Sequence, residues 1–121
     1  MDRMQGTDGV RREVRLQSDP TLYGLTPWEA FWREGVITER LMEGYAYAFV
    51  REWFGDANDV RVAVGWDPRD PGGVFTDAVV AGVRRAGATA VELGVVPTPA
   101  VPMYVAAEGA AAGLMVTASH N

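Results

Sequence analysis

A serine beside the chain's single histidine is the pair of residues best suited to chemistry, and both lie near the carboxyl end as Ser119 and His120. A serine hydroxyl can carry a phosphoryl group, and neighbouring hydrogen-bond donors can stabilise that group. The same residues followed by Asn121 are also typical of an ordinary polar loop. The pattern therefore names candidates, and the fold around them must decide between these two interpretations.

Several other reactive patterns are absent from the sequence. The Gly-x-Ser-x-Gly elbow of serine hydrolases does not occur, because Ser119 has Thr117 and Asn121 two positions away. The loop from Gly65 to Gly73 is rich in Gly and Pro, but it matches neither the Gly-x-Gly-x-x-Gly fingerprint of dinucleotide-binding folds nor a P-loop. A serine hydrolase is therefore disfavoured, and a nucleotide-binding loop is not indicated.

The elements that would position Ser119 alternate between strands and helices. Such alternation predicts a mainly parallel sheet with right-handed crossovers. Ligands in open sheets of this kind sit beyond the carboxyl ends of the strands, which is where Ser119 would lie. Strands are expected at 60–64, 90–93 and 113–117, and helices at 74–86 and 100–108.

The amino-terminal half predicts a marginal strand over 10–16 and two helices. The first helix is capped by Thr26, with Pro27 at its first position and Glu29 completing a capping box, and it ends near Gly35. The second is capped by Thr38, runs to about Phe54 and stops at Gly55. Its apolar stripe predicts a core-facing side made of Leu41, Tyr45, Ala48, Phe49 and Trp53.

Length and composition fit one globular domain covering 1–121. The chain has 121 residues, of which 48% are apolar and 22% charged. The net charge of −5 argues against a nucleic-acid partner, and no apolar run is long enough to span a membrane. The sequence has no cysteine, which excludes disulfides and thiolate metal sites. A cytoplasmic location is the default expectation.

The carboxyl end suggests that further sequence belongs to this protein. A parallel strand normally leads into a covering helix, and none remains after Asn121. We therefore expect additional domains in the same full-length chain.

Four segments, in order along the chain, resemble the first domain of the α-D-phosphohexomutases, the family of phosphoglucomutase, phosphomannomutase and phosphoglucosamine mutase. Gly6 to Arg11 resembles the opening F-G-T-D-G-I/V-R-G, and Val62 to Arg69 resembles V-x-V-G-x-D-x-R. Gly94 to Pro99 resembles G-x-x-P-T-P, and Gly113 to Asn121 resembles the phosphoserine loop G-I-M-I-T-A-S-H-N-P. The resemblance covers nearly the whole chain and implies a three-layer α/β/α fold with a small mixed, mainly parallel sheet.

The resemblance also implies an activity. Family members interconvert hexose 1-phosphates and hexose 6-phosphates through a phosphoserine, expected here at Ser119, and a bisphosphosugar intermediate. A phosphoserine carries nearly two negative charges, so it needs cations around it. The family supplies Mg²⁺, bound by the phosphoserine and by aspartates of a second-domain D-G-D-x-D-R loop that is not in this chain. Ser119 would thus contact the metal through its phosphate.

Roles for the other motif residues follow from the same resemblance. Arg11 matches the arginine that stabilises charge near the transferring phosphate. His120 matches the active-site histidine and is expected to support substrate oxygens or proton movement, and Asn121 to shape the loop.

Weaker expectations attach to two further loops. Asp67 and Arg69 could form an ion pair beside the active cleft, or a solvated turn around Pro68. Thr98 lies in a rigid turn and is a candidate for a position near the site rather than a catalyst.

The sequence departs from the family pattern at three places and leaves alternatives open. Gln5 replaces an aromatic residue, Arg12 replaces a glycine, and the segment 28–36 is longer than usual, with a packing role expected. The chain alone should be inactive, and a stand-alone, non-catalytic binding module remains the alternative. Glucose, mannose and glucosamine phosphates are all open as the substrate.

Overall fold

The computed structural model of the chain describes residues 13–56, 58–67 and 73–116. Strands and helices alternate from residue 61 onward, as the sequence predicts. In chain order the elements are β1 (Glu13–Val14), η3 (Pro20–Leu22), α1 (Pro27–Glu29), η4 (Ala30–Glu34), β2 (Val36–Ile37), α2 (Glu39–Phe54), β3 (Arg61–Trp66), α3 (Val74–Arg85), β4 (Thr89–Val95), α4 (Ala100–Glu108) and β5 (Ala112–Val116).

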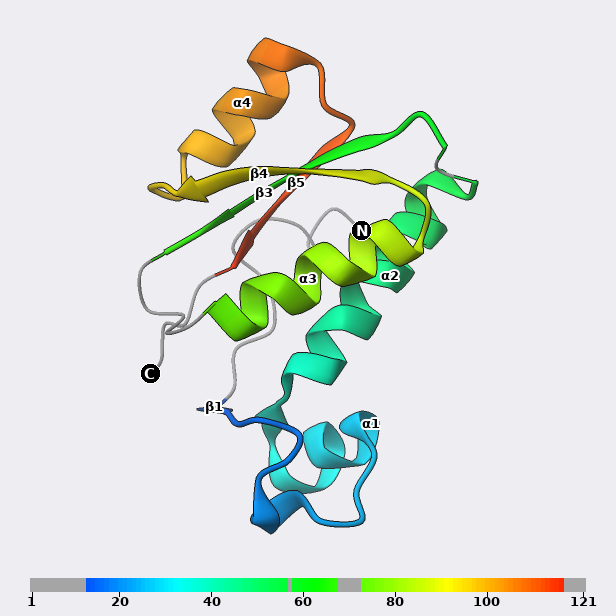
Figure 1. The fold of residues 1–121 in the computed structure, drawn as a ribbon, viewed down its shortest axis with the longest axis vertical. Coiled ribbons are helices and arrows are strands. Elements are labelled where there is room, and N and C mark those ends of the chain that lie inside the picture. The colour runs from blue at the N-terminus through cyan, green and yellow to red at the C-terminus, as the bar shows by residue number, and fades with distance from the viewer. Residues whose placement is uncertain (1–12, 57, 68–72, 117–121) are drawn as a thin grey trace.

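The main sheet has three strands in the order β4-β3-β5 (Figure 1). Both pairings are parallel, with Ala63 of β3 opposite Val91 of β4 and Gly113 of β5. A second, two-stranded parallel sheet joins β1 to β2, pairing Glu13 with Val36. All strand pairs in the described part of the chain are therefore parallel.

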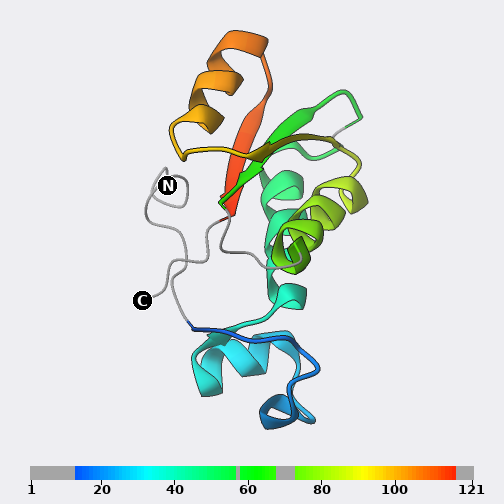
Figure 2. The same cartoon turned by 60° about the vertical axis from the view of Figure 1, so that its left-hand side comes forward.

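Helices cover both faces of the three-stranded sheet. Figures 1 and 2 show α2 and α3 on one face and α4 on the other. This arrangement is the three-layer α/β/α fold that the sequence predicts. The strands are longer than expected at their ends, since β3 continues through Trp66 and β4 reaches Val95.

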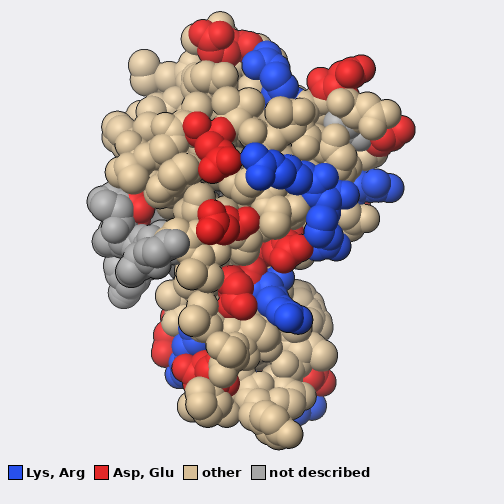
Figure 3. Space-filling view, viewed as in Figure 1, with Lys and Arg blue, Asp and Glu red and all other residues tan. Residues whose placement is uncertain are grey.

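The main core lies between the sheet and the α2–α3 pair. Val62 and Val64 of β3 are fully buried, and Val83 of α3 and Val50 of α2 pack into the same cluster. The two helices approach closely at Gly82, where an added methyl group would collide with the backbone carbonyl oxygen of Glu43. On the outer surface, arginine and carboxylate side chains are interspersed (Figure 3), including the ion pairs Arg85–Glu43 at 2.8 Å and Arg84–Glu92 at 3.2 Å.

The predicted core stripe of α2 is wrong in part. The fully buried positions of this helix are Ala46 and Val50, whereas Ala48 is exposed and Trp53 is 51% exposed. Tyr45 is half-buried, and its burial raises the pKa of its phenol. The side of α2 that faces α3 is centred on Ala46 and Val50, each one position after a residue of the predicted stripe. Gly82 of α3 allows the two helices to approach closely on this side.

The amino-terminal segment forms a small lobe of its own. Thr26 and Glu29 make the predicted capping box, and the helical region ends at Gly35, whose φ of +70° suits glycine. The last turns, η4, have π-helical hydrogen bonding, and β2 follows; neither was predicted.

The expected packing role of the segment 28–36 holds for only some of its residues. Ala30 and Val36 are buried together with Leu22. Trp28 and Trp32 remain more than half exposed, and their rings contact each other edge to face with centroids 5.6 Å apart.

Candidate functional site

The carboxyl ends of the three strands meet at one edge of the sheet. Trp66, the last residue of β3, lies opposite Val95 of β4 and Val116 of β5. The pairing continues past the strand ends, because the Asp67 N–H donates to the Val116 carbonyl oxygen at 3.1 Å and the Val96 N–H donates to that of Trp66 at 3.0 Å. The loops that follow all three strands therefore start beside one another.

The loop after β5 carries the main sequence candidates. Ser119 and His120 lie outside the described residues, as does Thr117, the expected last residue of the third strand. Ser119 is the third residue after Val116, the last residue of β5. The structure describes the edge at which β5 ends, and the role of the serine stays a prediction.

The loop after β4 is redirected by a β-bulge at this edge. The register between β3 and β4 shifts after Val64, so that Gly65 lies opposite Gly94. Gly94 has a φ of +88°, a conformation that residues with a side chain rarely adopt. Bulges commonly re-aim a strand next to a functional site. Here the bulge leads into the turn that holds Thr98, which is exposed, consistent with a place near the site.

Two helix amino termini lie at the same edge. Helix α3 begins at Val74 after the loop from β3, and α4 begins at Ala100 after the short loop from β4. The amino end of a helix carries partial positive charge, which stabilises an anion placed near it. The edge is therefore electrostatically suited to a phosphate.

Strand β1 comes directly after the amino-terminal candidate segment. Arg11 lies outside the described residues, but Glu13, two residues later, starts β1. In Figures 1 and 2, β1 lies on the same side of the molecule as the carboxyl ends of the three strands. The first described residues of the chain thus lie on the side of the molecule where β5 ends, and the role of Arg11 stays a prediction.

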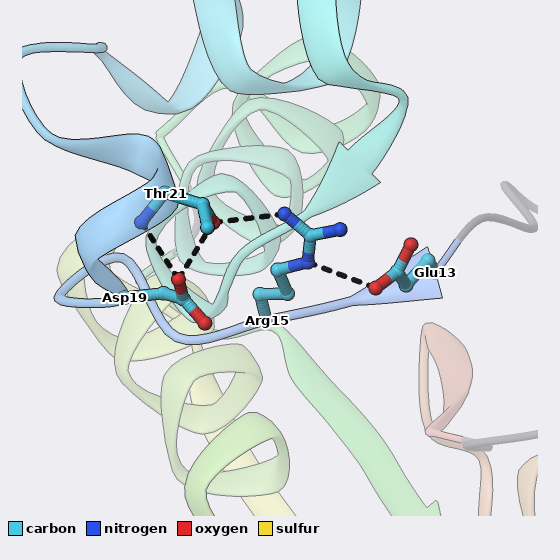
Figure 4. A network of polar contacts seen from close by, with 4 residues as sticks. All are labelled: Glu13, Arg15, Asp19 and Thr21. Carbon is cyan, nitrogen blue, oxygen red and sulfur yellow. Dashed lines mark hydrogen bonds and ion pairs between the residues drawn. The ribbon is translucent and has the colours of Figure 1, made fainter.

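A polar network anchors the residues after β1 (Figure 4). The Arg15 guanidinium donates to the Glu13 carboxylate and to the Thr21 hydroxyl, both at 2.8 Å. Thr21 in turn donates to one oxygen of Asp19 from its hydroxyl at 2.6 Å and its N–H at 2.8 Å. These bonds lower the pKa of Asp19, and the bond to Glu13 raises that of Arg15. The network is exposed, so we assign it an orienting role rather than a large stabilising one.

The described residues bring together only part of the predicted site. Asp67 lies at the carboxyl edge, whereas Arg69 and Asn121 lie outside the described residues, so the pairing of Asp67 with Arg69 stays a prediction. Across residues 13–56, 58–67 and 73–116, no group of three or more His, Cys, Asp or Glu side chains comes together as a metal site would require. A metal held by the phosphate of Ser119 and by ligands outside this chain also stays a prediction.

The structure adds residues that the sequence analysis did not select. Gly65, Gly94 and Gly113 lie within strands, where glycine usually marks a bulge or a close approach of another element. That signal was present in the sequence and could have singled them out.

In the described part of the chain, none of the helices has the length and apolar character needed to cross a membrane.

Comparison with known proteins agrees with the geometry. The profile of the family described as Phosphoglucomutase/phosphomannomutase, alpha/beta/alpha domain I matches residues 2–121. The phosphoglucosamine mutase of Parafrankia sp. (strain EAN1pec) is 57% identical over 124 residues, which cover 100% of this chain and 26% of that protein. The phosphoglucosamine mutase of Clostridium botulinum (strain Eklund 17B / Type B) is 38% identical, covering 100% of this chain and 23% of its own length. That of Streptococcus pneumoniae (strain Hungary19A-6) is 37% identical with the same coverage.

No solved structure matches the chain. The chain spans about a quarter of the length of the curated relatives named above. Its matched residues, its parallel sheet covered on both faces and its four motifs all agree, and the chain therefore belongs to the phosphoglucomutase/phosphomannomutase family as its α/β/α domain I.

Proposed function

We propose that the protein is a phosphohexomutase that interconverts hexose 1-phosphates and hexose 6-phosphates, with Ser119 as the residue that carries the phosphoryl group. The observation that supports this most directly is the convergence of three strand ends and two helix amino termini at the edge where the loop of Ser119 begins. An edge with this polarity suits a group that is doubly negative at rest.

The reaction divides into two transfers in opposite directions. In the first, the bond between phosphorus and the Ser119 oxygen breaks while phosphorus bonds to a free hydroxyl oxygen of the sugar phosphate. The hydroxyl proton leaves to a base, and His120 is the residue we assign to support that oxygen or its proton. The bisphosphosugar then turns around, and its other phosphate returns to Ser119.

Charge stabilisation is the main task of the residues around the transferring group. Arg11 is assigned to the phosphoryl oxygens, since a guanidinium can bind two of them at once. Mg²⁺, held through the phosphate of Ser119 and through ligands outside residues 1–121, would neutralise part of the same charge. Asp67 would border the loop from the neighbouring strand.

The choice of sugar is guided by the relatives. The relatives named above are phosphoglucosamine mutases, at identities from 37% to 57%. We therefore propose glucosamine phosphates as the preferred substrate, ahead of glucose and mannose phosphates. Sugar recognition would lie largely in the parts of the protein beyond this domain.

The test is a turnover assay on the full-length protein with Mg²⁺ and the 6-phosphates of glucosamine, glucose and mannose. We expect formation of the 1-phosphate, with the highest kcat/KM for glucosamine and loss of turnover on chelation by EDTA. A higher kcat/KM for glucose 6-phosphate or mannose 6-phosphate would contradict the proposed substrate but not the proposed reaction. If none of the three sugar phosphates is converted, the proposed mutase activity is wrong and a binding module is favoured.

A further inference from the structure

Two glycines leave space on the face of the sheet that α4 covers. Gly65 of β3 and Gly113 of β5 lie on this face, because Gly113 is opposite Ala63 and side chains two positions apart share a face. The opposite face carries Val62, Val64 and Val116 instead. The two faces of the same strands are thus packed in different ways.

One side chain of α4 occupies the space that both glycines leave. Val101, the second residue of α4, is only 4% exposed. A methyl group added at Gly65 would lie 2.9 Å from Val101 Cγ2 and 2.7 Å from Val96 Cγ2. One added at Gly113 would overlap Val101 Cγ1 and lie 3.0 Å from Val105 Cγ2. The two methyl groups of Val101 therefore fit into gaps on two neighbouring strands.

This contact joins the parts that form the candidate site. Gly65 is the next-to-last residue of β3 and belongs to the bulge, and Val101 belongs to the first turn of α4. Gly113 is the second residue of β5, the strand that Ser119 follows in the chain. Because protein interiors are close-packed, a change of one methyl group here must shift α4 relative to β5.

We propose that Val101, seated against Gly65 and Gly113, is a positioning residue for Ser119: it fixes the first turn of α4 relative to β3 and to the first half of β5, the strand that Ser119 follows in the chain. The inference rests on the proposed mutase function, because it concerns the geometry of phosphoryl transfer from that serine. Val101 itself touches no reacting atom in this account. Its effect is carried by the placement of β5 and of the first turn of α4.

The test is a double-mutant cycle in the full-length protein. Gly113→Ala should slow phosphoryl transfer by about 100-fold, the cost expected for a misplacement of about 1 Å at a reacting group. Gly113→Ala combined with Val101→Ala should recover most of that loss, because the second change removes the methyl groups that the first one overlaps. Val101→Ala alone, which opens a gap and adds no clash, should slow transfer by about fivefold. In each variant KM should stay within about twofold.

The readout is the single-turnover loss of phosphate from Ser119, normalised to the folded fraction by circular dichroism. A merely structural role would lower the melting temperature and leave this normalised rate unchanged. Gly44→Ala is the matched control, since Gly44 has open space around it and an ordinary φ. Its transfer rate should equal that of the unmodified protein.

The outcomes separate this inference from the function on which it rests. If Gly113→Ala fails to fold, Val101→Ala and the double variant still decide the matter. A normalised rate in Val101→Ala equal to that of the Gly44→Ala control would overturn the positioning role, as would a double variant no faster than Gly113→Ala. If the unmodified protein carries no phosphate on Ser119, the proposed function itself fails.

Discussion

The two edges of the three-stranded sheet are built differently. At the amino edge, residues 86–88 join α3 to β4, and residues 109–111 join α4 to β5. Hydrogen bonds to the backbone close both turns. The Gly87 N–H donates to the Arg84 carbonyl oxygen at 2.9 Å in the first turn, and the Ala111 N–H donates to the Arg61 carbonyl oxygen at 2.8 Å in the second. The Arg61 guanidinium adds a side-chain bond to the Glu108 carbonyl oxygen at 2.7 Å. At the carboxyl edge, the connections 67–73 and 96–99 are rich in Gly and Pro and carry three of the candidates from the motifs, Asp67, Arg69 and Thr98.

The difference indicates that the amino edge contributes to stability and the carboxyl edge to function. Short turns closed by the backbone contribute to folding, whereas loops positioned by a rigid scaffold carry function. Substitutions at the amino edge should therefore change stability with little effect on catalysis. Substitutions at the carboxyl edge should do the reverse. The first three predictions below test this contrast, and the last concerns the amino-terminal lobe beside the sheet.

The largest effect is expected for Ser119→Ala, which removes the proposed phosphate carrier in the segment after β5. Removal of the phosphate carrier should lower mutase turnover by about 10⁴-fold or more, because no other group takes over the covalent step. The melting temperature should not change. The assay is steady-state turnover of the full-length protein, with Ser18→Ala in an exposed turn as the control. Undiminished turnover in Ser119→Ala would defeat the assignment of this residue.

A core substitution in the amino-terminal half of β3 should act on stability instead. Val62 is fully buried among the residues of the main core. Val62→Ala should lower the free energy of unfolding by about 2 kcal/mol, from lost burial and the cavity left behind. Urea unfolding measures this change, and turnover per folded molecule should stay within about twofold. A normalised turnover reduced tenfold would contradict the separation of the two edges.

A smaller loss of stability is expected from a turn at the amino edge. Gly87 has a φ of +100°, and an alanine there would be strained even though the space around it is open. Gly87→Ala should cost about 1–2 kcal/mol of unfolding free energy. Gly44→Ala, in a helix with an ordinary φ, should instead gain about 0.5–1 kcal/mol, because alanine is the better helix former. Equal effects of the two substitutions would show that backbone conformation is not the cause.

The smallest effect concerns the exposed network that follows the Arg11 segment. Hydrogen bonds from Thr21 hold the pKa of Asp19 below its ordinary value of 3.8. A carboxylate with a lowered pKa in the folded state stabilises the fold above its unfolded pKa, and that contribution is lost as the pH falls through the folded pKa. Asp19→Asn should therefore lower the melting temperature slightly at pH 7 and not at all at the lowest pH. Equal differences at pH 7 and below pH 3 would contradict the ionic origin.

Much of the fold was predictable because its signals are local. Capping chemistry alone identifies Thr26, Thr38 and Gly55 as helix boundaries, and the structure confirms all three. The alternation of strands and helices predicted the parallel sheet. The face of α2 that is buried was not predictable in the same way, since it depends on how closely α3 approaches at Gly82. A contact between two helices distant in sequence leaves no periodic signal in either one.

The motif residues of the candidate site could be predicted from the sequence, but the packing contacts that hold its elements in place could not. Asp67 and Thr98 were selected from their segments, and the structure places both at the carboxyl edge. The placement of Val101 against Gly65 and Gly113 could not be inferred, because it joins three elements that come together only in the folded sheet. Ser119, His120 and Arg11 stay predictions, since they lie outside the described residues.

The most direct test of the central claim is phosphopeptide mapping of the full-length protein, purified from its native host in the presence of phosphatase inhibitors. The account predicts one phosphate, located on Ser119, which is exchanged for the labelled phosphate of a hexose phosphate during turnover and which a dephosphorylated protein regains from a hexose bisphosphate. A protein that carries no phosphate on Ser119 under either condition would contradict the claim that the carboxyl edge of this sheet is a phosphoryl-transfer site.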